Sequence, residues 1–186
     1  MFGVFPAALL CYFFRRDPQL AARRRQRREQ RPEQKLWQAL RTPLWLALFV
    51  LPGSNHRFGW SRTLLAEVPP WLSVLGRGLV FCSWVLIFEA FRDNAFAAVI
   101  QVEPGQRVVS EGPYRVVRHL MYSVAVLMVS AVPLAPGSCV ALPLAAPLIA
   151  LLVFRLLNEE RFLVTALPGN AEYCQHASFR LIPFAW

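Results

Sequence analysis

Apolar runs separated by shorter polar segments divide the chain into a series of candidate helices. A transmembrane helix needs about 20 predominantly apolar residues, with a range of about 17–25. Four of the runs fall in that range, and the run at the N-terminus is shorter. The runs are residues 2–14, 36–52, 70–91, 119–135 and 139–157. The pattern predicts an all-α fold, a polytopic membrane protein with about five transmembrane helices.

The N-terminal run, residues 2–14, allows three interpretations. It lacks the basic residues that precede the apolar part of a cleaved signal peptide, so we expect it to be retained. It either forms a thin span, gains length because Arg15 and Arg16 reach towards the interface, or enters and leaves the membrane on one side.

Individual residues within the second and third runs predict local features. Trp37 and Trp45 are expected to anchor the second run at the membrane interface, and Pro43 to kink its helix. Gly76 and Gly78 in the third run are expected to allow close contact with another helix.

Two polar clusters interrupt the apolar pattern in the second half of the chain. The first, residues 105–122, is basic and contains the turn signal Gly112-Pro113. The second, residues 155–161, reads R-L-L-N-E-E-R. One hairpin of membrane length separates the two clusters, so they are expected to meet on the same side of a bilayer.

The composition agrees with a single membrane domain. The chain has 186 residues, 56% of them hydrophobic and 17% charged, and its mean hydropathy is +0.39. Soluble domains average about 45–50% apolar and about 25% charged residues. We expect one domain over residues 1–186, with membrane spans in 1–91 and a cofactor-binding core in 92–186. The four cysteines are far apart and form no CxxC pair, so free, buried thiols and no metal site are expected.

Most of the net charge of +9 comes from residues 15–35, which hold nine Arg or Lys and three acidic residues. The positive-inside rule puts this segment in the cytoplasm, and both polar clusters then fall on the cytoplasmic face. The segment either only fixes this topology or forms a basic amphipathic helix on anionic lipid. A nucleic-acid-binding arm is the third interpretation, disfavoured because residues 15–35 contain no aromatic residue and membrane lies on both sides. We expect the bilayer as partner, and no nucleic acid.

Helical spacing groups the ionisable residues of the two clusters. His119 and Tyr122 are three residues apart, and Arg155 and Glu159 four, so each pair shares a helix face. Glu160 lies about 100° further round and is expected to point elsewhere. Such residues at the end of a span usually face the bundle interior or a water-filled cavity. Together they suit a zwitterionic small ligand, although each residue alone is better explained as a topology anchor, an intrahelical ion pair or a belt aromatic.

The motifs around these residues resemble those of a known family. G-P-Y-R-V-V-R-H-L-M-Y at residues 112–122 is similar to G-P-Y-R-x-x-R-H-P-x-Y of the isoprenylcysteine carboxyl methyltransferase family and its phospholipid methyltransferase relatives. R-L-L-N-E-E-R-F-L resembles the family motif R-x-x-x-E-E-x-x-L, and P-G-N-A-E-Y-C-Q-H resembles a tail segment F-G-x-x-Y-x-x-Y. The match covers roughly residues 92–186.

The resemblance implies a membrane-embedded methyltransferase with S-adenosyl-L-methionine as cofactor, bound in a site that is not a Rossmann fold. It implies that Arg155 faces the substrate and that Arg155 and Glu159 are the catalytic residues. The cofactor-binding residues that it implies are Gln101, Gln106, Arg107, Val108, Val109, Tyr114, His119, Leu120, Met121, Tyr122 and Glu159.

The predicted function is methyl transfer to a lipid-like or isoprenoid-linked acceptor, by carboxyl O-methylation. The alternatives are a phospholipid N-methyltransferase and a non-catalytic relative. The chain departs from the family at Leu120, where the family has proline, at Pro168, where it has phenylalanine, and at His176, where it has tyrosine. Proline suits the first turn of a helix, so Leu120 is the departure closest to the site. The expected location is a bacterial inner membrane, with the site facing the cytoplasm.

Overall fold

The computed structural model describes residues 11, 32–59, 68–93, 108 and 112–186. Within these residues the fold is helical and contains no named strand, which confirms the all-α prediction for this part of the chain. The elements are α3 (Pro32–Phe58), α4 (Pro70–Asp93), η1 (Gly112–Arg115), α5 (Leu120–Ala131), η2 (Cys139–Ala141), α6 (Leu142–Ala166) and α7 (Asn170–His176).

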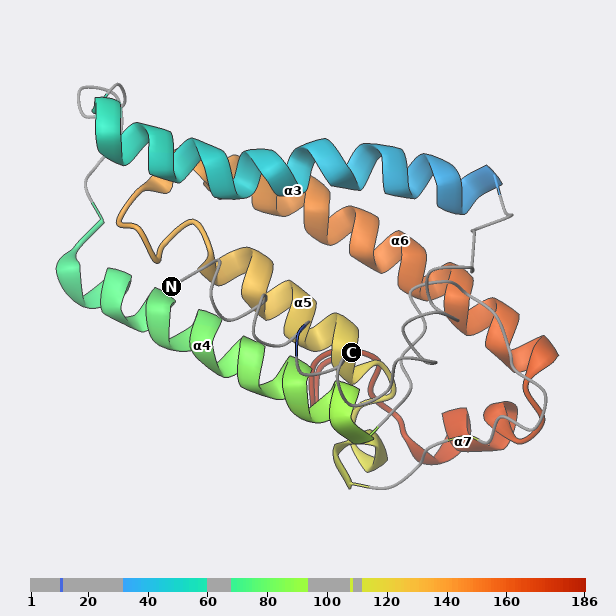
Figure 1. Cartoon of the computed structure of the whole chain (residues 1–186). Helices are drawn as coiled ribbons and strands as arrows, with labels where there is room; N and C mark the ends of the chain where they lie inside the picture. The colour runs from blue at the N-terminus through green and yellow to red at the C-terminus, as the bar shows by residue number, and fades with distance from the viewer. Residues whose placement is uncertain (1–10, 12–31, 60–67, 94–107, 109–111) are drawn as a thin grey trace.

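The four long helices lie side by side in the order α4, α5, α6, α3 (Figure 1). Neighbours run in opposite directions, which the short connection between α5 and α6 requires of that pair. Although α3 and α4 follow each other in the sequence, α5 and α6 lie between them (Figure 1). The start of α3, the start of α5 and the end of α6 therefore lie at one end of the bundle.

Helix boundaries depart from the apolar runs in both directions. The run at 70–91 corresponds closely to α4, whereas α5 is shorter than the predicted span 119–135. The second run ends at residue 52, whereas α3 continues through Pro43 and Pro52 to Phe58. The fifth run likewise ends at residue 157, whereas α6 continues to Ala166. Arg, Leu and Glu are good helix formers, so a helix can continue through a polar cluster at which the apolar run ends.

Two sets of predictions fall on parts of the chain that the structure does not describe. The N-terminal run at 2–14 lies outside the described residues, apart from Cys11. The polybasic segment does too, apart from its last residues, which begin α3.

The core lies where the helices meet, and at Gly76 the helix α4 closely approaches the turn that follows α5. Leu48, Leu148 and Leu156 are fully buried. A β-carbon on Gly76 would lie only 2.9 Å from the backbone nitrogen of Ala135. The predicted close contact is thus confirmed at Gly76. It is wrong at Gly78, where a β-carbon would meet nothing within 4 Å.

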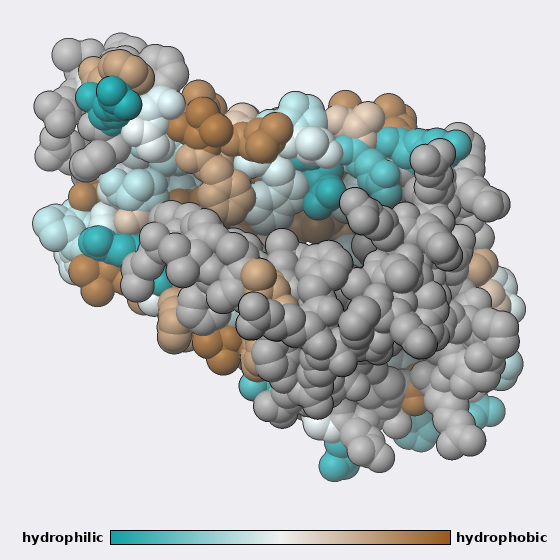
Figure 2. Space-filling model, in the orientation of Figure 1, coloured by the Kyte–Doolittle hydropathy of each residue, from teal (hydrophilic) through white to brown (hydrophobic). Residues whose placement is uncertain are grey.

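Within the part of the chain that the structure describes, two helical segments are long and apolar enough to cross a membrane: Pro70–Glu89 and Cys139–Ala166. The most apolar window of each is mostly exposed, only 22% and 28% buried, which is unlike the core helix of a soluble protein. Hydrophobic side chains such as Leu46 on α3 and Phe81 on α4 are exposed, and Figure 2 shows hydrophobic residues along the outer edges of these helices. The five-span topology stays a prediction.

The described cysteines are free thiols. Burial was predicted for them, but Cys11 and Cys82 are exposed, and Cys139 and Cys174 are only half-buried.

Candidate active site

The two polar clusters meet at one end of the bundle, as the hairpin spacing predicted. The α5–α6 hairpin brings the first turn of α5 against the C-terminal half of α6. The opposite end carries a different contact, in which the buried amide of Asn55 donates a 2.9 Å hydrogen bond to the hydroxyl of Ser138.

A network of three side chains joins the clusters. The hydroxyl of Tyr122 donates a 2.5 Å hydrogen bond to Oε2 of Glu159, and Nε of Arg155 donates to the same hydroxyl at 3.2 Å. Tyr122 and Arg155 are only 6% and 5% exposed, so both polar groups are buried in the protein. The predicted shared face of Arg155 and Glu159 is confirmed, since both side chains reach one hydroxyl on α5. We call these three residues the Tyr122 network.

Arg155 also stacks on an aromatic ring from α3. Its guanidinium carbon lies 4.3 Å from the ring centroid of Trp37, and Arg41 lies over the same ring at 4.8 Å. The indole Nε1 of Trp37 donates a 2.8 Å hydrogen bond to the carbonyl of Leu151 on α6. The prediction that Trp37 anchors the chain at the membrane interface is wrong, because its side chain is buried between α3 and α6.

Sequence reasoning therefore missed Trp37 and Arg41 as neighbours of the site. The four-residue spacing of these two residues on α3 was a usable signal, since it puts a cation and an aromatic ring on one helix face. Their contact with α6 depends on tertiary packing, which the sequence pattern does not contain.

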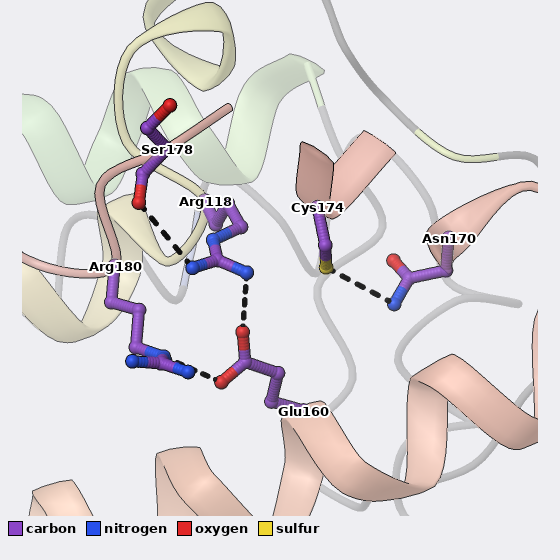
Figure 3. Close-up of polar contacts among 6 residues, drawn as sticks. All are labelled: Arg118, Glu160, Asn170, Cys174, Ser178 and Arg180. Carbon is purple, nitrogen blue, oxygen red and sulfur yellow. Dashed lines mark hydrogen bonds and ion pairs between the residues drawn. The ribbon is translucent and has the colours of Figure 1, made fainter. Parts of the chain in front are cut away.

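Glu160 belongs to a separate ion-pair cluster, shown in Figure 3. Its Oε1 accepts a 2.6 Å hydrogen bond from Arg118, and its Oε2 accepts one of 2.8 Å from Arg180. Arg118 also donates to the carbonyl of Ser178 at 3.4 Å. Glu160 thus points away from the Tyr122 network, as its helical position predicted. We call Arg118, Glu160 and Arg180 the Glu160 cluster.

The C-terminal segment holds the turn that precedes α5. The backbone N–H of Arg118 donates to the carbonyl of Phe179 at 2.9 Å, and that of His119 donates to the carbonyl of Arg180 at 3.1 Å. The hydroxyl of Ser123 donates to the carbonyl of Leu181 at 2.5 Å. The helix begins at Leu120 without the family proline, and these bonds fix the direction in which the chain enters it.

His119 contributes a neutral imidazole beside the Tyr122 network. It lies in the turn before α5, and its ring meets the Tyr122 ring edge-on at a centroid distance of 5.8 Å. Burial lowers the pKa of His119 to about 4, so the ring is uncharged at neutral pH. Its Nε2 atom is buried and has no hydrogen-bond partner among the residues that the structure describes.

The short helix α7 closes the same end of the molecule. It begins after Gly169, whose φ of 82° is a left-handed conformation that favours glycine. A β-carbon on Gly169 would lie 4.0 Å from Cγ2 of Val108, so the two positions are neighbours. The Tyr173 hydroxyl donates a 2.7 Å hydrogen bond to the carbonyl of Tyr114. Burial raises the pKa of Tyr173 to about 12, which keeps this donor protonated. Within α7, Asn170 contacts the sulfur of Cys174 at 3.9 Å (Figure 3).

The predicted site residues divide into three groups. Arg155, Glu159, Tyr122 and His119 are brought together in one place. Val108 and Tyr114 lie beside α7 and the residue preceding it, while Leu120 and Met121 form the half-buried first turn of α5. The remaining four lie outside the described residues: Gln101, Gln106, Arg107 and Val109.

Comparison with known proteins gives one family match. Residues 71–168 match a protein-family model described as phospholipid methyltransferase. No individual curated protein matches the chain. The matched part contains the Tyr122 network complete, whereas α3, with Trp37 and Arg41, precedes it, and Arg180 follows it.

Proposed function

Because the chain belongs to the phospholipid methyltransferase family, we propose that it is an integral membrane methyltransferase that uses S-adenosylmethionine and acts on a lipid-like acceptor. The family is membrane-associated and belongs with the isoprenylcysteine carboxyl methyltransferase-like enzymes, so the family predicted from the motifs is confirmed. The observation that carries the proposal is the Tyr122 network, which puts a carboxylate, a hydroxyl and a guanidinium in contact at one buried point.

The residues present fit the proposed cofactor. A sulfonium cation and an ammonium group call for a carboxylate, which Glu159 supplies, held by the Tyr122 hydroxyl. Buried polar atoms are normally paired, so the Nε2 atom of His119, unpaired among the described residues, suits a hydrogen bond with a bound molecule. We assign these three residues to the cofactor side of the site.

Arg155 belongs to the acceptor side in this proposal. A guanidinium holds a carboxylate or phosphate in a planar, two-point arrangement, which orients the acceptor. The hydrogen bond to Tyr122 and the stacking on Trp37 restrict the rotation of the Arg155 side chain. Fixed orientation of this kind is the main contribution that a protein makes to a displacement between two bound molecules.

S-adenosylmethionine, when bound, supplies a methyl group attached to an electron-poor sulfur. That methyl group would pass to a lone pair of the acceptor held by Arg155, and the sulfur would keep the electron pair of the broken carbon–sulfur bond. A carboxylate acceptor has such a lone pair at neutral pH and needs no base, which makes carboxyl O-methylation our first proposal. The buried position of the site keeps water from competing for the methyl group.

Phospholipid N-methylation is the second candidate, favoured by the description of the matching family. A protonated amine must lose a proton before it attacks, so this reaction needs a base. Glu159 is the better candidate base of the two neighbouring glutamates, because both oxygens of Glu160 already accept hydrogen bonds from arginines.

Purified protein, radiolabelled S-adenosylmethionine and total membrane lipid test the proposal. Label transferred to lipid is the expected result, and absence of cofactor binding by calorimetry would overturn it. Treatment of the labelled lipid with mild base separates the two candidates, because methyl esters release volatile methanol and methylamines do not.

Arg155→Ala tests the assignment of the two sides. We expect turnover to fall by about a thousandfold or more, since a buried charge that orients the acceptor is lost, while the dissociation constant of S-adenosylmethionine stays within about threefold. Loss of both turnover and cofactor affinity would show that Arg155 serves the cofactor side instead.

A further inference from the structure

Trp37 reaches the site from α3, a helix that lies outside the family match at residues 71–168. Its side chain is buried in the core, where α3 lies against α6 (Figure 1). The guanidinium carbon of Arg155 lies 4.3 Å from the centroid of its ring. Trp37 therefore contacts the residue that the proposed function assigns to the acceptor.

The indole N–H fixes this ring at one turn of α6. It donates a 2.8 Å hydrogen bond to the carbonyl of Leu151. In an α-helix that carbonyl also pairs with the backbone N–H four residues later, which is that of Arg155. Long side chains on a helix point back over the turn that precedes them, so the Arg155 side chain extends over the turn on which the indole is fixed. One hydrogen bond and the geometry of α6 thus bring the ring and the guanidinium together.

Arg155 is held from both neighbours of α6. From α5, the hydroxyl of Tyr122 accepts a hydrogen bond from its Nε at 3.2 Å, and from α3 the Trp37 ring meets its guanidinium. An arginine side chain has many rotamers, and each fixed contact removes some of them. A cation is attracted to an aromatic ring most strongly where water is excluded, and Arg155 is buried. Contacts from two helices restrict the guanidinium more than either contact does alone.

We infer that Trp37 is a positioning residue that acts on the methyl acceptor through Arg155. The inference rests on the proposed function in taking Arg155 as the residue that orients the acceptor. It adds α3 to the acceptor side of the site, although α3 precedes the part of the chain that matches the family. A Trp37 with a purely structural role would instead change the stability of the fold and leave the Arg155 guanidinium where Tyr122 holds it.

The position of the Arg155 side chain can be measured without any methyl acceptor. In the 15N-labelled full chain in detergent, its Nε–H group gives a 1H–15N signal, which Arg155→Lys assigns by removing it. Because an aromatic ring shifts the signals of nearby protons, we expect Trp37→Leu to move this signal and to broaden it. Trp37→Phe keeps a ring but loses the indole N–H, so it should move the signal less. An unchanged signal in Trp37→Leu would overturn the inference.

Trp45→Leu is the matched control. Trp45 also lies on α3 and packs against the same core, about 12 Å further along the helix. This variant should lower the midpoint of thermal unfolding about as much as Trp37→Leu does, and leave the Arg155 signal unchanged. A shift as large as that in Trp37→Leu would show that the signal reports a general loosening of α3, which also overturns the inference. Should Trp37→Leu fail to fold, Trp37→Phe carries the test against the same control.

A double-mutant cycle measures whether Trp37 acts through Arg155 in methyl transfer. We expect Trp37→Leu to lower the single-turnover rate about tenfold, while the dissociation constant of S-adenosylmethionine stays within about twofold. In the Arg155→Ala background the same change should have no further effect, because the group that Trp37 positions is gone. Equal losses in both backgrounds would show that Trp37 acts independently of Arg155 and would count against the inference.

The two measurements separate this inference from the proposed function. If the Arg155 signal depends on Trp37 but no lipid is methylated, the proposed function fails and the positioning of Arg155 by Trp37 stands. If lipid is methylated and Trp37→Leu leaves the rate unchanged, the inference fails and the function stands.

Discussion

Glu159 and Glu160 are neighbours in the sequence, yet they belong to different kinds of polar cluster. Glu159 accepts a hydrogen bond from a tyrosine hydroxyl, and through it meets Arg155. Glu160 makes direct ion pairs with Arg118 and Arg180. A rotation of about 100° per residue along α6 is enough to send the two carboxylates to different partners.

The two clusters also connect different parts of the chain. The Glu160 cluster joins α6 to the turn before α5 and to the C-terminal segment, and both of its carboxylate oxygens are paired. The hydrogen bonds of Tyr122 to Glu159 and Arg155 join α5 to α6, and Arg155 also stacks on Trp37 of α3. The first arrangement is that of a structural clamp, whereas the second contains the residues to which the proposed function assigns the cofactor and the acceptor.

This difference predicts that the two glutamates affect different measurements. Glu160→Gln should lower the free energy of unfolding by about 3 kcal/mol, because it leaves the buried Arg118 without its counter-ion. Thermal unfolding in detergent measures the loss. Cofactor affinity at low temperature should stay close to that of the wild type.

Arg180→Ala provides the control for that prediction. The Arg180 side chain is 35% exposed, against 10% for Arg118, so solvent screens its pair with Glu160 more strongly. We expect a loss of about 1 kcal/mol or less. A larger loss than for Glu160→Gln would contradict the view that Glu160 is the centre of the clamp.

Glu159→Gln should weaken cofactor binding and leave the stability of the fold nearly unchanged, the reverse of what we expect for Glu160→Gln. The carboxylate is proposed to balance the cofactor's positive charge, so the variant should weaken S-adenosylmethionine binding about a hundredfold, or about 2.7 kcal/mol. The midpoint of thermal unfolding without cofactor should change little, because glutamine still accepts a hydrogen bond from Tyr122. An unfolding loss as large as that of Glu160→Gln, with cofactor affinity intact, would reverse the two roles.

Local helical geometry explains why the sequence was sufficient for part of this comparison. The four-residue spacing of Arg155 and Glu159 and the one-residue step to Glu160 translate directly into faces of α6, and the structure agrees with both. The hairpin length likewise predicted that the two polar clusters meet.

Other features depended on contacts that hydropathy does not encode. Trp37 was interpreted as an interfacial residue because tryptophan at the start of an apolar run is typical of one, yet its ring packs against α6. The extension of α6 to Ala166 was missed because the run R-L-L-N-E-E-R is polar, although most of its residues favour helix. The ion pair of Arg180 could not be predicted from helical spacing, since its partner lies 20 positions earlier in the chain.

Tyr122→Phe sharpens the comparison with the smallest change. It removes only the hydroxyl that joins Glu159 to Arg155, and leaves the ring packed in the core. We expect the maximal rate of methyl transfer to fall about tenfold, which corresponds to about 1.4 kcal/mol in the activation free energy. The reason is that Arg155 and Glu159 lose the hydroxyl that fixes their side chains relative to each other. Single-turnover kinetics at saturating cofactor measure this rate, with Tyr173→Phe as a control that removes a hydroxyl outside the Tyr122 network. If Tyr122→Phe lowers only the unfolding temperature and leaves the rate unchanged, the Tyr122 network is a second clamp and the contrast between the two glutamates disappears.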